Sequence, residues 1–323
     1  MRRVLQFEEY GMIRLSEGLP SDFSRFLLPQ AFAFHANGPW GTICLQEIET
    51  QGFLLRHFLF SLQKTISFYL NGSKGIPQSL LSLNGRFEHS IQGQQKITLH
   101  EKEYLLFSTA GQETRTTVYQ EKVSSLLNAH YTSYAYNEFL PVFQDFERDL
   151  KKTLTEPYYF NQSPGVARHT VHEAINAIWQ DNYIPSLVTK HIELRLKSTL
   201  FTLLAQSYTQ IQEEPLTPIE KEKSFAAREI ILRDITEHKT PNQIASELYC
   251  SAAWLKKAFS KVYGIGMFHF LRSTRMERAR EMLLRGESLK AVALEVGMKP
   301  SNFPKEFKSF FGYTVTALKK GQV

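Results

Sequence analysis

The stretch IASELYCSAAWLKKAFSKVYG, residues 244–264, recurs 48 residues further along the chain as VALEVGMKPSNFPKEFKSFFG, residues 292–312. The two stretches differ at most positions but keep their apolar residues in place. These are Ile244, Ala245, Leu248, Leu255 and Phe259 in the first stretch and Val292, Ala293, Val296, Phe303 and Phe307 in the second. Apolar residues three, four and seven positions apart form one face of a helix. Each stretch is therefore predicted to be a helix-turn-helix unit.

The residues at the predicted helix ends support this assignment. Thr240-Pro241-Asn242-Gln243 combines a capping hydroxyl, a proline at the first helical position and a glutamine three residues after the cap, which is a capping box. Ser251 is predicted to cap the second helix of the first unit. In the second unit Ser288 takes the capping position, and Gly297 supplies the turn because glycine adopts left-handed backbone geometry cheaply.

A connecting helix is predicted between the two units, from Met267 to Arg285, where apolar residues recur at helical spacing. About 18 residues at about 1.5 Å each give a length of about 27 Å. With the flanking units added, this length approaches the roughly 34 Å turn of B-DNA. The second helix of each unit can therefore enter successive major grooves on one face of a duplex.

The second helix of a helix-turn-helix unit lies in the major groove with its N-terminal half toward the base edges. In the first unit the residues on the open side are Ser251, Ala253, Lys256 and Lys257. Lysine reaches guanine acceptors or phosphates, and a small alanine permits contact with a thymine methyl group. We predict that these four residues contact DNA; the alternative is an ordinary solvated helix face.

The second helix of the second unit is predicted to start near Pro300. The residues on its open side are Ser301, Asn302, Lys305 and Lys308. Asparagine pairs with adenine through two hydrogen bonds, and Lys305 reaches guanine or phosphate. Lys308 is predicted to contact backbone phosphate, which fixes position without specifying sequence. Pro304 would lie a full turn inside this helix, where proline removes a backbone donor, so we expect the helix to be bent or shortened.

The net charge of +6 is unevenly distributed along the chain. Residues 217–323 hold 19 Lys and Arg against 11 Asp and Glu, a balance of +8, and residues 1–216 hold 19 against 21, a balance of −2. A basic C-terminal third favours a polyanion-binding module joined to a part that binds no polyanion. The charge alone leaves a merely soluble surface as an equal alternative.

Residues 41–134 are predicted to be rich in β-strands, because short apolar or alternating runs end at turn residues. Three such turns are Asn71-Gly72, Asn84-Gly85 and Gln92-Gly93, and Asn-Gly supplies the positive φ angles that tight hairpins need. Many short, regularly spaced strands are typical of a β-barrel or sandwich. Aromatic residues on these strands line a ligand cavity or fill a core. They are Phe53, Phe58, Phe60, Phe68 and Tyr69.

Helical periodicity follows over residues 137–210. The longest apolar stripe there consists of Leu187, Val188, Ile192, Leu196, Leu200, Leu203 and Leu204. Such a stripe covers the barrel of its own chain or contacts a second protomer in a homodimer, and the first use is commoner. Residues 210–218 contain two glutamates and two prolines, and we place the domain boundary there, between residues 212 and 213.

Few residue patterns point to catalysis or to metal binding. Cys44 and Cys250 have no CxxC or Cys/His neighbour, which argues against a disulfide framework and a zinc site. The histidines of the strand-rich region are scattered, at His57, His89, His100 and His130. No phosphate-binding glycine loop or nucleophile elbow is present. We predict no catalytic site, no metal and no cofactor, with a cupin-type metalloenzyme fused to a DNA-binding module as a distant alternative.

The sequence predicts no membrane span, because no apolar run approaches the roughly 18 residues that a bilayer requires. Charged residues interrupt the first thirty positions, so we also expect no signal peptide. The two unpaired cysteines favour a reducing compartment, the cytoplasm.

About the last hundred residues resemble the AraC/XylS family of bacterial transcription regulators. The resemblance is carried by Ile244-Ala245 through Ala258-Phe259, by Leu271-Arg272 through Leu283-Leu284 and by Val292-Ala293 through Tyr313-Thr314. The chain departs from the family pattern at Tyr249, where a glycine is common, at Thr314-Val315 in place of Thr-Pro, and at Leu318-Lys319 in place of Tyr-Arg. Residues 227–232 and 264–285 are most similar to the subset named for siderophore-responsive regulators such as the pyochelin regulator.

This resemblance implies a cupin-like N-terminal domain that binds an effector or a second protomer. It also implies DNA contact at Ala253, Lys256, Lys257, Ser301, Asn302 and Lys305. The predicted fold class is α+β. Residues 1–212 form a cupin-like β-barrel domain with helices, and residues 213–323 form an all-α domain in which a connecting helix joins two helix-turn-helix units.

The expected function is sequence-specific regulation of transcription of the AraC type, and the resemblance implies an activator that responds to a small-molecule effector. The predicted partners are double-stranded promoter DNA, a small-molecule effector and RNA polymerase, whose contact with an activator is the family expectation. Nothing in the residues distinguishes activation from repression. An architectural protein that binds nucleic acid without sequence choice is the alternative, because phosphate contacts dominate affinity in both classes.

Overall fold

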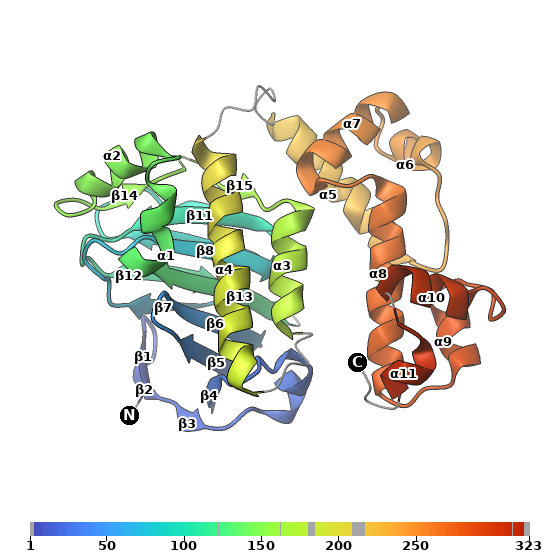
Figure 1. Ribbon diagram of the computed structural model, residues 1–323, viewed down its shortest axis with the longest axis horizontal. Helices are drawn as coiled ribbons and strands as arrows, with labels where there is room; N and C mark the ends of the chain where they lie inside the picture. The colour runs from blue at the N-terminus through green and yellow to red at the C-terminus, as the bar shows by residue number, and fades with distance from the viewer. Residues whose placement is uncertain are drawn as a thin grey trace. The chain divides into compact units, whose positions relative to one another are not determined.

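The computed structural model describes residues 3–121, 123–161, 163–179, 185–208, 217–311 and 313–319. The chain divides into two compact units, Met1–Glu213 and Glu214–Val323 (Figure 1). The predicted boundary between residues 212 and 213 lies outside the described residues. The α+β fold class is confirmed, because the first unit combines antiparallel sheets with helices and the second unit is helical.

Two antiparallel sheets form most of the N-terminal unit. The six-stranded sheet has the order β10 (Ile97–Leu99), β9 (Phe87–Ile91), β12 (Thr114–Val118), β7 (Ile66–Leu70), β1 (Val4–Phe7) and β2 (Gly11–Arg14). The nine-stranded sheet has the order β14 (Tyr158–Tyr159), β11 (Glu103–Ser108), β8 (Gln78–Asn84), β13 (Ser124–Tyr131), β6 (Phe53–Leu62), β5 (Gly41–Glu49), β4 (Phe32–Gly38) and β3 (Ser16–Glu17), and β15 (Gly165–Val166) pairs with β11.

The two sheets pack face to face through an apolar core that aromatic side chains fill. Strand alternation sends Phe58 and Phe60 of β6 and Phe68 of β7 into this core. The ring of Phe68 lies 5.4 Å from that of Phe58 and 5.8 Å from that of Phe60, between centroids. Phe53 faces the opposite side of its sheet, and the half-buried Tyr69 donates a hydrogen bond to Glu8. The five predicted aromatic residues therefore do not line one cavity: three of them fill the core between the sheets, and Phe53 belongs to the core under the helices.

Helices cover the other face of the nine-stranded sheet (Figure 1). They are α1 (Ser133–Tyr136), the short 3₁₀ helix Asn137–Phe139, α2 (Gln144–Lys152), α3 (His169–Trp179) and α4 (Pro185–Tyr208). Six of the seven residues in the predicted α4 stripe are buried in the core that α4 shares with the sheet, so the stripe covers its own chain. The exception is Leu187, which is 50% exposed on the opposite side of the helix.

The strand-rich region is longer than predicted. It begins at β1 rather than at residue 41, because a strand as short as Val4–Phe7, in which the apolar Val4 is exposed, does not show a clear apolar–polar alternation. Two further strands, β14 and β15, interrupt the predicted helical region 137–210 and pair with β11. Each of these strands is two residues long, which is too short to show the alternation of apolar and polar residues that predicts a strand.

Two of the three predicted turns do not close hairpins. Asn71-Gly72 links β7 to β8 and Asn84-Gly85 links β8 to β9, and in each case the flanking strands belong to different sheets. Glycine is instead required at position 72 because the backbone of Gln112 lies close to it. A Cβ atom there would lie 1.9 Å from the carbonyl oxygen of Gln112. Gln92-Gly93 does close a hairpin, between β9 and β10.

The C-terminal unit is a chain of helices. They are α5 (Pro218–Arg233), α6 (Pro241–Glu247), α7 (Ala252–Tyr263), α8 (Met267–Leu284), α9 (Leu289–Glu295), α10 (Phe303–Phe311) and α11 (Val315–Lys319). The first of these starts at Pro218, where Thr217 and Glu220 form a capping box.

In the described residues, no helix is both long and apolar enough to cross a membrane. That part of the chain also gathers no group of three or more His, Cys, Asp and Glu side chains able to hold a metal ion. Cys44 is buried, Cys250 is partly exposed, and both are free thiols.

Three histidines of the N-terminal unit are buried, and none of them pairs with a carboxylate among the residues that the structure describes. His57 bonds to Ser125 at 2.8 Å, His89 lies 3.3 Å from the Thr116 hydroxyl, and His130 bonds to Asn128 at 2.9 Å. Burial lowers the pKa of His57 to about 3 and that of His89 to about 4. Burial, and then the nearby Arg56 guanidinium, lower the pKa of His130 to about 3.

We expect the free energy of unfolding to fall as the pH drops below 6.5, the ordinary histidine pKa. The unfolded chain then binds a proton at each of these imidazoles, whereas the folded chain binds it only near its own lower pKa. Each imidazole contributes up to about 1.4 kcal/mol per pH unit between these limits. Urea unfolding followed by tryptophan fluorescence between pH 6.5 and 5 measures the change of the unfolding free energy with pH. His57→Gln should reduce this slope by up to about 1.4 kcal/mol per pH unit, the contribution of one imidazole. The matched variant His100→Gln, at an exposed position, serves as control; equal slopes for wild type and His57→Gln would contradict this account.

Candidate nucleic-acid interface

The first helix-turn-helix unit consists of α6 and α7, and its predicted capping interactions are confirmed. The Thr240 hydroxyl accepts from the backbone N–H of Gln243 at 3.3 Å, and the Gln243 side chain accepts from the N–H of Thr240 at 2.7 Å. Ser251 caps α7 by accepting from the N–H of Trp254 at 3.2 Å. The Ser251 hydroxyl thus already has a structural role at the start of the helix that is predicted to enter DNA.

The turn between α6 and α7 depends on left-handed backbone at Tyr249, whose φ is +51°. The backbone N–H of Cys250 donates to the carbonyl of Ala245 at 3.0 Å, which closes the turn. Tyr249 is 94% exposed. Non-glycine residues pay about 1–2 kcal/mol for left-handed geometry, so this position carries strain without burying its ring.

Helix α7 presents the predicted contact residues to solvent. Leu255, Phe259 and Val262 are fully buried on one face, whereas the exposed side chains on the other face include Ala253, Lys256 and Lys257. In the described part of the chain neither lysine forms an ion pair within the protein. Their ammonium groups are therefore available to an external anion.

The second unit consists of α9 and α10, and α10 starts later than predicted. Ser288 caps α9 by accepting from the N–H of Ala291 at 3.2 Å, and Gly297 turns the chain with a φ of +68°. Helix α10 begins at Phe303 rather than near Pro300. Because Pro304 lacks the N–H that would bond back to Pro300, the regular helix starts no earlier than Phe303, the residue before Pro304.

Pro304 is therefore the second residue of α10, where a missing N–H costs little. Ser301 and Asn302 lie in the turn that precedes the helix rather than on its first turn. The N–H groups of Asn302 and Phe303 both donate to the carbonyl of Lys299, at 2.9 and 3.1 Å. The predicted contact residues of this unit, Ser301, Asn302, Lys305 and Lys308, are all exposed.

Helix α8 joins the two units, and its arginines are mostly engaged within the protein. Arg272 pairs with Glu306 at 2.5 Å, and Arg275 donates to the backbone carbonyls of residues 235 and 236. Arg280 lies over the ring of Phe311, 5.9 Å from its centroid. These arginines of α8 therefore stabilise contacts within the domain. The positive charges available to an external anion are those of the exposed lysines on α7 and around α10.

Residues 244–321 match the model of a helix-turn-helix domain. This match spans both repeats and the helix between them, in the order that the AraC/XylS resemblance requires. The C-terminal unit is an AraC-type helix-turn-helix domain. The predicted resemblance is thereby confirmed for this part of the chain, and a DNA-binding domain of this type belongs to transcription regulators.

Solved structures similar to the chain include three regulators. ToxT from Vibrio cholerae is 14% identical, with 83% of this chain and 98% of that chain covered and a TM-score of 0.33. The AraC-like transcriptional activator CuxR is 13% identical, with 83% of this chain and 87% of that chain covered and a TM-score of 0.35. The C-terminal domain of the response regulator yesN from Fusobacterium nucleatum is 25% identical, with 31% of this chain and 98% of that chain covered and a TM-score of 0.29. No curated protein matches the chain.

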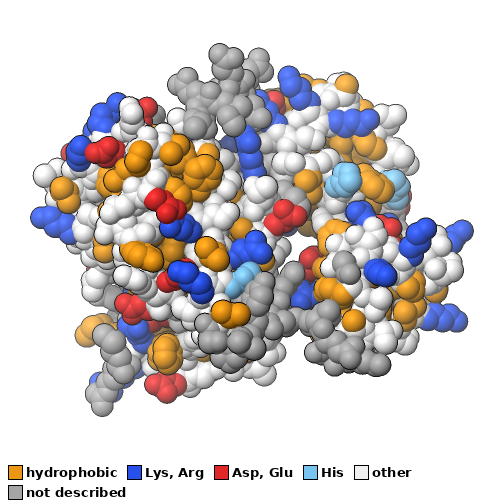
Figure 2. All heavy atoms as spheres, in the orientation of Figure 1, with side chains coloured by type: hydrophobic (Ala, Val, Ile, Leu, Met, Phe, Trp, Pro, Cys, Tyr) orange, Lys and Arg blue, Asp and Glu red, His pale blue; other side chains and the backbone are white. Residues whose placement is uncertain are grey.

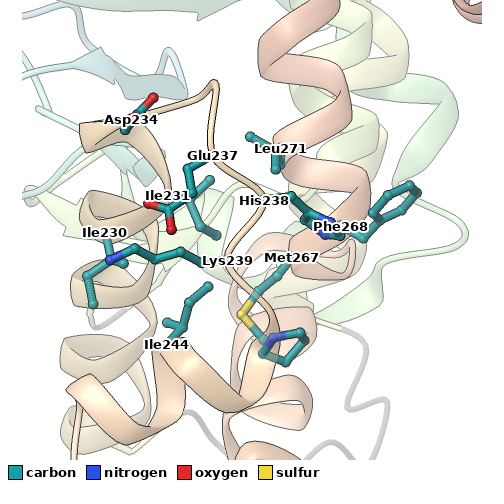
Figure 3. A pocket seen from close by; sticks show the side chains of 11 residues that line it. Ile230, Ile231, Asp234, Glu237, His238, Lys239, Ile244, Met267, Phe268 and Leu271 are labelled. Carbon is teal, nitrogen blue, oxygen red and sulfur yellow. The ribbon is translucent and has the colours of Figure 1, made fainter. Parts of the chain in front are cut away.

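One feature of the AraC-type domain has no signal in the sequence. The loop of residues 234–240, between α5 and α6, lies against α8 and borders a small pocket (Figure 3). The apolar lining of this pocket includes Ile230, Ile231, Ile244, Met267 and Leu271, and the loop contributes Asp234, Glu237, His238 and Lys239. Residues from three segments far apart in the sequence meet here, which local periodicity cannot predict.

We expect Tyr249→Gly to stabilise the domain by about 1 kcal/mol relative to Tyr249→Ala. Glycine relieves the left-handed strain, whereas alanine removes the exposed ring but keeps the strain. Urea unfolding of the two variants and the wild type measures the difference. If both substitutions gave the same free energy of unfolding, the turn would not be under strain.

Proposed function

We propose that this protein is a sequence-specific transcription regulator that binds promoter DNA through α7 and the segment 301–308. One observation carries the proposal: two helix-turn-helix units on a single connecting helix each leave lysines exposed at the start of their second helix. Lys256 and Lys257 serve the first unit, and Lys305 and Lys308 serve the second. Ala253 and Asn302 lie beside them and would make the contacts that distinguish bases.

The experiment that tests this proposal is selection of bound genomic DNA fragments by the purified full-length protein. A two-part motif, with halves about one helical turn apart, is the expected result for two linked recognition helices. Absence of enrichment over random fragments would overturn the proposal and favour the architectural alternative. Repeating the selection with small-molecule extract of the host tests effector control.

Substitution of Lys257 separates base contact from phosphate contact. Lys257→Ala should weaken binding to the selected site by about 1–3 kcal/mol and relax its sequence preference at one position, if the ammonium group bonds a guanine. Lys64→Ala removes an equal charge from an exposed position of the N-terminal unit and should leave binding unchanged. Fluorescence anisotropy with selected and scrambled duplexes measures both; an equal loss on every sequence would assign Lys257 to phosphate.

We further propose that the N-terminal unit binds a small polar effector. Beyond its aromatic core, the N-terminal unit holds a charged network around one buried carboxylate. Glu47, whose side chain is 4% exposed, forms ion pairs with the partly exposed Arg56 at 2.9 Å and Arg3 at 2.6 Å. Arg56 lies 3.4 Å from a ring nitrogen of His130. An effector that exchanges hydrogen bonds with this network would change the packing of both sheets, which supports this unit as the sensing part.

We also propose that α4 joins two copies of the chain. Leu187, Leu194 and Phe201 recur every seven residues on its outer side and are 50, 59 and 43% exposed. Figure 2 shows hydrophobic side chains on this face, over α4 and toward α1 and α2. Three large apolar residues in one row on a helix are typical of a helix-pairing seam.

Leu194→Glu tests this role, because it places a charge in the middle of the row. We expect a dimer to become a monomer in sedimentation velocity at micromolar concentration. Met12→Glu changes an exposed apolar residue of β2 instead and should leave the dimer intact. A wild-type protein that is monomeric throughout this range would contradict the assignment.

A further inference from the structure

The second helix-turn-helix unit touches the loop that leads into the first unit, beside the connecting helix. Gly297, in the turn of the second unit, packs against the backbone of Thr236, in the loop between α5 and α6. A Cβ atom at Gly297 would lie 2.3 Å from the carbonyl oxygen of Thr236 and 2.5 Å from its Cα. No side chain fits between the two backbones, so this contact holds the two segments at one distance.

Arg275 of α8 binds the same loop from the connecting helix. Its Nε donates to the carbonyl of Ile235 at 2.6 Å, and its Nη2 donates to the carbonyl of Thr236 at 2.9 Å. Two donors in the fixed plane of one guanidinium orient the loop as well as holding it. The Thr236 carbonyl therefore lies between Gly297 of the second unit and Arg275 of the connecting helix.

The loop itself is held in shape by Asp234. Its carboxylate accepts from the backbone N–H of Thr236 at 2.8 Å and from the Thr236 hydroxyl at 2.6 Å. These hydrogen bonds lower the pKa of Asp234, because they stabilise its charged form. The residue that Gly297 contacts is thus held by Asp234 as well as by Arg275.

A second tie fixes α10 to α8 on the side of the second unit. Arg272 bonds to Glu306 at 2.5 Å and to Ser309 at 3.3 Å, and its guanidinium lies 5.5 Å from the ring centroid of Phe310. The recognition helix α10 therefore follows α8, and α8 is in turn bound to the first unit through Arg275. A lone connecting helix could twist at its ends, but a contact off its axis removes that freedom.

We propose that Arg275, Thr236 and Gly297 form a clasp that sets the angle and separation of the two recognition helices, so that the protein selects DNA by the spacing of its half-sites. This inference rests on the proposed DNA-binding function. One added base pair moves a half-site by about 3.4 Å and rotates it by about 34–36° around the duplex. A clasped pair of units cannot follow that displacement, whereas an unclasped pair can.

The DNA test uses the selected two-part site and versions with one base pair added to or removed from its centre. We expect the wild-type protein to bind the altered sites at least about tenfold more weakly. Arg275→Gln should reduce that difference to about threefold or less. Arg275→Lys keeps the charge but cannot bond both carbonyls, so it should behave like Arg275→Gln; it also carries the test if Arg275→Gln fails to fold.

The control is Arg278→Gln. Arg278 lies one turn further along α8 and, among the described residues, pairs only with Glu281. Its substitution removes the same charge as Arg275→Gln. It should keep the wild-type spacing preference. A similar loss of preference in this variant would overturn the clasp, because it would trace the effect to charge alone.

A measurement without DNA keeps the clasp and the proposed function distinguishable. Spin labels at Lys256→Cys and Lys308→Cys, in a Cys250→Ser background of the full chain, report the distance between α7 and α10. We expect a single narrow distribution that Arg275→Gln broadens. A wild-type protein without sequence preference would overturn the proposed function, and the label distances would still test the clasp. Unchanged label distances in Arg275→Gln, or an unchanged spacing preference, would overturn the clasp.

Discussion

The C-terminal unit depends on the fact that α8 is shared by two hydrophobic cores. In its first half, Phe270 packs against Phe259 and Tyr263 of the first unit, with ring centroids 5.6 and 5.5 Å apart. In its second half, residues from Met276 onward enter the core that α9, α10 and α11 share. Because one helix belongs to both cores, neither unit can separate from it without exposing apolar surface. The two recognition helices are therefore placed by packing before any DNA is bound.

The local features of the two units were predictable because they depend on residues within one helical turn. The capping box at Thr240, the caps at Ser251 and Ser288 and the turn at Gly297 each follow from a few adjacent side chains. The start of α10 was not predicted correctly, although Pro304 contained the information. Proline was interpreted as a defect inside a helix, whereas the structure begins the helix so that Pro304 falls in its first turn.

Contacts between distant segments were beyond sequence analysis. Asn71-Gly72 is a strong hairpin signal, but the strands on either side of it belong to different sheets, and Gly72 is needed for its approach to Gln112. The same holds for the aromatic residues of the strands. Periodicity predicted strands at β6 and β7, yet only the packing of the sheets decides that Phe58 and Phe68 fill a core while Phe53 faces the helices. The predicted DNA contacts stay predictions, because the structure establishes their exposure and not their partner.

The repeat offset shows why the two units are not interchangeable. Tyr249 and Gly297 are 48 residues apart, so they occupy the same place in the two units, and both adopt left-handed backbone, with φ values of +51° and +68°. Tyr249 is 94% exposed, so its Cβ atom and ring are accommodated there and the left-handed backbone costs only local strain. At Gly297 the backbone of Thr236 excludes any Cβ atom as well. Glycine at position 297 thus meets two requirements, one from the turn and one from the neighbouring unit, and only the first of these exists at position 249. Two copies of one motif have therefore come under different constraints, because one of them also closes the contact that joins the pair.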